Sequence, residues 1–273
     1  MPAADAPCPE QAFNATALKW HTCAWLLLPV LVFLAGWMHW YAALPLTLLT
    51  AAGLAPRKRK EPQTRDSLPA FPLFTRSSFL ALAAFAALMA LSGWGEWVNQ
   101  HPDHIVRNAC LRELVASPWP VIFPDGNVLI YNTGFWLVPA LAGKLAGLDA
   151  ARMLVVLWGA WGLFLSWLWL CVFSGRRSLL LALLMAAFGS LLNLQCWLGL
   201  NLFRLHYFGT AEQIMCSANA SIPVLLFFIF LASGRMPLYW MPILFAATAF
   251  YSPLAALGGL PLAACQWRRQ WKG

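Results

Sequence analysis

Residues 153–173 read MLVVLWGAWGLFLSWLWLCVF, a run without a charged side chain. A helix that crosses a bilayer needs about 20 consecutive apolar residues, and this run meets that length. Further apolar runs cover residues 24–54, 79–94, 128–148, 179–192, 222–232 and 238–265. Together the runs predict an all-α fold, a polytopic transmembrane helical bundle of about seven to nine spans that forms a single membrane domain over residues 1–273.

The composition supports this class and excludes others. Hydrophobic residues make up 61% of the chain and charged residues 10%, whereas soluble domains carry about 25% charged residues. The formal net charge is +8, but the lysines and arginines form short clusters between the apolar runs rather than one basic face. Such clusters are typical of topology signals, so we expect membrane lipids as a partner and no nucleic acid.

The basic segments orient the expected spans. Residues 57–60 (RKRK) form the densest basic cluster, and the positive-inside rule assigns it to the cytoplasm. Residues 95–127 and 194–221 then become polar loops on the outer side. If residues 176 and 177 lie inside, the runs 128–148 and 153–173 cannot both cross the membrane completely. We expect the run 128–148 to be the incomplete crossing.

The first apolar run, residues 24–54, is longer than one span needs. Pro29, the segment 39–41 (HWY) and Pro45 interrupt it, so it forms either a hairpin of two short spans or one long kinked helix. The run lacks a cleavage site of small residues in a polar setting, so we read it as retained rather than as a signal peptide.

The expected outer loop at 95–127 concentrates acidic side chains. It holds four of the chain's ten acidic residues: Glu96, Asp103, Glu113 and Asp125. A carboxylate cluster at the mouth of a membrane bundle suits a general base or a cation ligand. On a helix, Asp103 and Arg107 share one face, where the arginine favours the ionised carboxylate. The alternative is a solvated amphipathic helix with an ordinary ion pair.

Two other polar segments are candidate binding sites. Residues 117–120 (SPWP) interrupt any helix, and Trp119 forms either an interfacial turn or the wall of a substrate groove. In the loop at 194–221, Arg204 and His206 either bind the phosphate of a lipid-linked donor or extend to lipid head groups. No spacing of histidines or cysteines predicts a metal site or a disulfide framework, although Cys196 and Cys216 could pair outside the cell.

Several motifs occur in an order found in a group of bacterial polytopic membrane proteins. Residues 103–108 (DHIVRN), 111–114 (LREL) and 118–121 (PWPV) are similar to that group's Asp-Trp-x-Lys-His-Asn, Leu-x-Asp-Leu and Pro-Trp-Pro-Val. Residues 129–145 (LIYNTGFWLVPALAGKL) and 252–258 (SPLAALG) resemble its later motifs. The chain thereby resembles the GT-C class of membrane glycosyltransferases.

This resemblance implies a site and a reaction. In that class a carboxylate in the first large outer loop acts as the base or holds a divalent cation, and the donor is a sugar on a polyprenyl phosphate. By position Asp103 takes the catalytic role, with Glu113 in support. The substrate-binding candidates are Arg107, Asn108, Trp119, Arg204, His206 and Gln213. The resemblance also implies the bacterial inner membrane as the location and a lipid-linked sugar donor as a partner.

A different class of function is the alternative. The chain could be a non-catalytic membrane subunit or a transporter, or a truncated or diverged relative of the transferases. A transporter is expected to carry ionisable groups near the middle of its spans, whereas the charges here lie almost wholly between the apolar runs. That pattern favours chemistry at the membrane surface.

Overall fold

The computed structural model describes residues 15–56, 75–98, 100–188 and 209–272. In these ranges the chain is all-helical, apart from one isolated antiparallel bridge between Ile122 and Val128. The all-α prediction is confirmed for them. The elements in chain order are α1 (Ala15–Trp37), α2 (Trp40–Leu54), α3 (Arg76–Leu91), α4 (His104–Ala116), α5 (Gly134–Ala146), α6 (Leu148–Ser174), α7 (Leu179–Ala187), α9 (Thr210–Ala232), the 3-10 turn η2 (Leu238–Trp240), α10 (Met241–Tyr251), α11 (Pro253–Gly258) and α12 (Leu260–Lys272).

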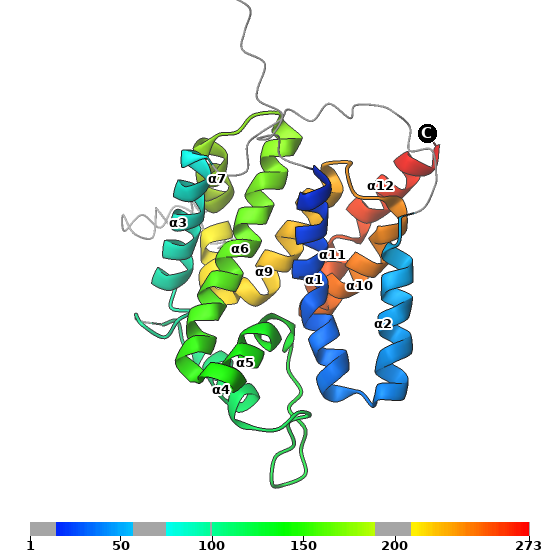
Figure 1. Ribbon diagram of the computed structural model, residues 1–273. Coiled ribbons are helices and arrows are strands. Elements are labelled where there is room, and N and C mark those ends of the chain that lie inside the picture. Colours follow the sequence, from blue (N-terminus) through cyan, green and yellow to red (C-terminus); the bar gives the residue numbers. More distant parts are fainter. Residues whose placement is uncertain (1–14, 57–74, 99, 189–208, 273) are drawn as a thin grey trace, which may run out of the picture.

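Helix α6 is the central element of the bundle, and Figure 1 shows it between α3 on one side and α1 on the other. It begins after Gly147 and ends at Gly175, whose φ of 68° is the left-handed conformation that glycine adopts at helix ends. Within α6, Gly159 and Gly162 leave room for Met89 of α3 and Trp25 of α1. Small residues at helix crossings allow this close approach.

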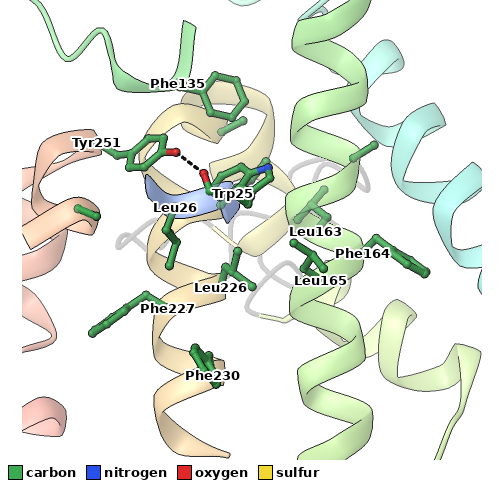
Figure 2. Packing of buried hydrophobic residues seen from close by; sticks show 14 of the residues in the cluster. Trp25, Leu26, Phe135, Leu163, Phe164, Leu165, Leu226, Phe227, Phe230 and Tyr251 are labelled. Carbon is green, nitrogen blue, oxygen red and sulfur yellow. Dashed lines mark hydrogen bonds between the residues drawn. The ribbon is translucent and has the colours of Figure 1, made fainter. Parts of the chain in front are cut away.

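The core is aromatic, and hydrogen bonds to backbone carbonyls join its rings to neighbouring helices. Figure 2 shows Trp25 beside Tyr251, whose hydroxyl donates to the Trp25 carbonyl at 2.9 Å. The Trp25 ring stacks on Tyr251 at 5.5 Å and on Trp158 at 5.1 Å, and its indole N–H donates to the Trp158 carbonyl. These contacts join α1, α6 and α10 through stacked rings and two hydrogen bonds to backbone carbonyls.

Three helices are long and apolar enough to cross a membrane: Thr16–Trp37, Leu148–Ser174 and Thr210–Ala232. This finding indicates membrane association. The described part of the long N-terminal run forms two helices, because α1 continues through Pro29 to Trp37 and the chain turns at Met38 and His39 before α2. Only Ser252 separates α10 from α11, which begins at Pro253.

The two ends of the bundle differ. In Figure 1 the end of α2, the start of α3 and the end of α6 lie at the upper end, whereas α4, α5 and the loop between them lie at the lower end. Helix α5 has 13 residues and a length of about 20 Å at 1.5 Å per residue, which is short of the roughly 30 Å of a bilayer core. This length agrees with the expectation that residues 128–148 do not cross completely.

The crossing at Gly162 generates a stability prediction. A Cβ added there would lie 2.6 Å from Ile222 Cγ2 and 2.7 Å from Trp25 Cζ2. We therefore expect Gly162→Val to destabilise the fold by about 1–3 kcal/mol, the usual cost of overpacking. Gly258→Val is the matched control, because an added Cβ there meets nothing within 4 Å. Thermal unfolding of both purified variants tests this, and equal melting temperatures would contradict it.

Candidate functional site

Arg107, in the first turns of α4, contacts side chains from three segments of the described chain. Its residue surface is only 8% exposed. Its Nη2 lies 3.3 Å from Ser217 Oγ, to which it donates, and 3.7 Å from Asp103 Oδ2. The guanidinium also lies over the Trp94 ring, 5.6 Å from its centroid. Helical spacing of four residues explains the Asp103 contact, and the fold supplies the other two.

Ser217 stands at a kink of α9. Its backbone is non-helical, with φ −152° and ψ 44°. Such a break leaves backbone carbonyls of the preceding turn without their usual helical partners. Two side chains from outside the helix pair with these carbonyls. Trp94 Nε1 donates to the Ile214 carbonyl at 2.8 Å, and His104 Nε2 lies 2.9 Å from the Met215 carbonyl.

His104 is completely buried beside this kink. Burial lowers its pKa below the usual value, and the nearby Arg107 charge adds to this, against the opposing hydrogen bond to Met215. The side chain is therefore neutral at pH 7. A carbonyl partner requires the proton on Nε2, which leaves Nδ1 unprotonated and, among the described residues, without a hydrogen-bond partner.

Arg107 retains donors that no described residue accepts. Its Nε and Nη1 are buried and have no hydrogen-bond partner in the described part of the chain. A buried unpaired donor costs about 1–3 kcal/mol, and more when it is charged. An anionic oxygen is the partner that a guanidinium binds best. The cluster of Trp94, Asp103, His104, Arg107 and Ser217, called here the α4–α9 site, therefore has the chemistry of an anion site beside a carboxylate.

The carboxylate of Asp103 is open to solvent. Its side chain is 53% exposed, and besides Arg107 it lies 3.5 Å from Nδ1 of His101. An exposed carboxylate beside a buried cation can take a proton from a hydroxyl group while the cation binds a second, anionic group. Among the described residues, no three His, Cys, Asp or Glu side chains are grouped to hold a metal ion.

A second ionic cluster holds α4 in place. Glu96, in the loop before α4, has a left-handed backbone conformation with φ 61°, which residues other than glycine rarely adopt. Its carboxylate accepts from Arg112 of α4 at 2.5 Å and from Arg152 of α6 at 2.7 Å. Burial alone would raise the pKa of Glu96, but the hydrogen bonds and charges of the two arginines outweigh it and lower the pKa.

The other predicted residues that the structure describes have other hydrogen-bond partners. Glu113 is ten residues further along α4, about 15 Å at 1.5 Å per residue, and accepts from Ser117 Oγ. Asn108 exchanges hydrogen bonds with Gln100 and so fixes the loop before α4. Gln213 lies in the first turn of α9, where its carbonyl accepts from Ser221. Arg204, His206 and Cys196 lie outside the described residues.

Trp119 packs into the bundle. Its Nε1 donates to the Leu114 carbonyl at 2.8 Å, and its ring lies 4.9 Å from that of Trp37 in α1. The ammonium group of Lys144 in α5 lies over the Trp119 ring, 5.0 Å from its centroid, and donates to the Ser117 carbonyl. The SPWP segment is thus an ordered turn that closes the end of α4.

No family model matches the chain, and no curated protein or solved structure is significantly similar to it.

The Glu96 cluster generates a pH prediction. Because its folded-state pKa is the lower one, Glu96 stabilises the fold above the ordinary glutamate pKa of about 4.3, and this contribution is lost as the pH falls through the folded-state pKa. We expect Glu96→Gln to cost about 1–2 kcal/mol at pH 7, since the half-exposed Arg112 is screened by solvent. The deficit should shrink in acid.

Chemical unfolding of wild type and Glu96→Gln at a series of pH values from 7 downward measures this difference. Asp149→Asn is the matched control, because Asp149 pairs with the same Arg152 but its side chain is 94% exposed. A deficit that is independent of pH, or equal in the two variants, would contradict the role given to Glu96.

Proposed function

We propose that the chain is a polytopic protein of the bacterial inner membrane and a GT-C-like glycosyltransferase, which moves a sugar from a lipid-linked donor to an acceptor on the outer side. The observation that carries the proposal is Arg107, buried at the end of an apolar bundle with two open donors beside the exposed carboxylate of Asp103. An anion-binding cation next to a general base is the pair that such a transfer requires.

The layout of charge supports the proposed topology. The described helices include three candidate spans and several shorter apolar helices, which is compatible with seven to nine crossings or partial crossings. In the sequence, Arg176 and Arg177 follow α6 and residues 57–60 follow α2, and in Figure 1 the ends of both helices lie at the upper end of the bundle. Helix α4 lies at the other end. The positive-inside rule then assigns the α4–α9 site to the outer face.

The proposed reaction divides the work between the two charges. Arg107 and the Ser217 hydroxyl bind oxygens of the donor phosphate. Asp103 takes the proton of the acceptor hydroxyl as its oxygen bonds to the anomeric carbon. The bond from that carbon to the phosphate oxygen breaks, and the polyprenyl phosphate leaves with the electron pair. Arg107 stabilises the charge that develops on this leaving group.

Glu113 has a more distant role in this proposal. At about 15 Å from Asp103 along α4 it cannot act on the same hydroxyl, so it would contact a separate part of the substrate or hold the end of the helix. The proposal leaves any divalent cation to Asp103. A non-catalytic membrane subunit or a transporter is the alternative. A protein of either kind would show no sugar transfer of its own, and a change of Asp103 would leave the measured incorporation as it was.

Transfer of radiolabelled sugar from a polyprenyl-phosphate donor pool tests the function. Membranes expressing wild type, Asp103→Asn and Glu113→Gln are compared at equal expression, with Asp125→Asn as the control because Asp125 is an exposed loop carboxylate. We expect Asp103→Asn to lower incorporation by about 100-fold or more, as loss of a general base does. Wild-type incorporation no higher than in vector membranes would instead favour the non-catalytic subunit.

A further inference from the structure

The polarity of the first turn of helix α4 is reversed relative to a helix that faces water. In this turn the titratable side chains are inside, with His104 at 0% and Arg107 at 8% exposure, and the apolar side chains are outside, with Ile105 at 74% and Val106 at 57%. Further along α4 the buried side is apolar and is formed by Cys110, Leu111 and Leu114. A surface helix of a soluble protein has the opposite arrangement. Charged groups facing the interior and apolar groups facing outward are typical of helices in contact with lipid.

The outward residues form a continuous stripe. Ile105, Ala109, Arg112 and Ala116 are all exposed, and their spacing of four, three and four residues keeps them on one side of the helix. Three of these four side chains are apolar. Helix α4 has 13 residues, about 20 Å, so it is too short to cross the bilayer itself.

The stripe carries the features of the membrane–water interface. Arg112 is 53% exposed within it and can reach lipid phosphates while it binds Glu96. Trp97, 54% exposed in the loop before α4, is the residue type that concentrates at head-group level. The combination of apolar surface, an exposed cation and an exposed indole matches a phospholipid surface in both shape and charge.

We propose that α4 lies along the outer phospholipid surface, with the stripe of Ile105, Ala109, Arg112 and Ala116 in contact with lipid. The opposite side of the same helix carries Arg107 and adjoins Asp103, so the α4–α9 site is at bilayer level. A lipid-borne donor then reaches the site by lateral diffusion and does not have to leave the membrane. This last consequence rests on the proposed function, whereas the position of α4 does not.

Photo-crosslinking tests the position of α4. The photoreactive amino acid p-benzoylphenylalanine is placed at position Ile105 or Ala109 of the full chain, reconstituted in vesicles of phosphatidylethanolamine and phosphatidylglycerol. Position Asp125, in the exposed loop between α4 and α5, is the control. We expect several-fold more phospholipid adduct, measured by mass spectrometry of the irradiated protein, at Ile105 and Ala109 than at Asp125.

Two outcomes would overturn the proposal. Equal lipid adducts at all three positions would mean that the stripe faces water, and crosslinks between two copies of the chain would mean that protein covers it. Two positions on one stripe keep the test valid where one substitution disturbs the fold. Because the readout is an adduct, it is independent of transfer activity, and failure of the proposed transferase would leave it unchanged.

Discussion

The burial of the Arg107 guanidinium is the constraint on which the polar end of the molecule depends. A cation removed from water is expensive unless other groups replace its hydration. Here Asp103 supplies the opposite charge, Ser217 a hydroxyl acceptor and Trp94 an aromatic face. These partners come from the start of α4, the kink of α9 and the loop after α3. The cation therefore joins the segment around the start of α4 to the kink of α9, which lies 110 residues further along the chain.

The apolar bundle makes this arrangement possible because its own polar atoms are mostly paired internally. Much of this pairing comes from tryptophan indole N–H groups. Trp94 donates to the Ile214 carbonyl, Trp169 to Thr22 Oγ1 and Trp240 to the Leu54 carbonyl, and each contact joins segments more than 100 residues apart. A chain with 16 tryptophans can thus use large side chains both to fill the core and to hold helices in register.

Sequence periodicity and charge predict much of the fold. The apolar runs predict helices, and a Ser-Pro pair is typical of a helix boundary such as the one between α10 and α11. The spacing of Asp103 and Arg107 predicts their proximity on α4. Ser217 could not be predicted as a member of the site, because it lies 110 residues from Arg107 and no glycine or proline stands at the kink itself. The sequence pattern does not point to Trp94 or His104 either. The exposed apolar side chains of α4 are not predicted either, because the sequence analysis assigns this segment to a polar loop, whereas the helix exposes Ile105 and Val106.

The most direct test of this account is whether Arg107 binds a lipid phosphate. Native mass spectrometry of the purified protein with a polyprenyl phosphate, and separately with the uncharged polyprenol, measures this for wild type and Arg107→Gln. The account predicts that wild type retains the phosphorylated lipid in preference to the alcohol and that Arg107→Gln loses this preference. An undiminished preference in Arg107→Gln would contradict the assignment of the α4–α9 site as an anion site.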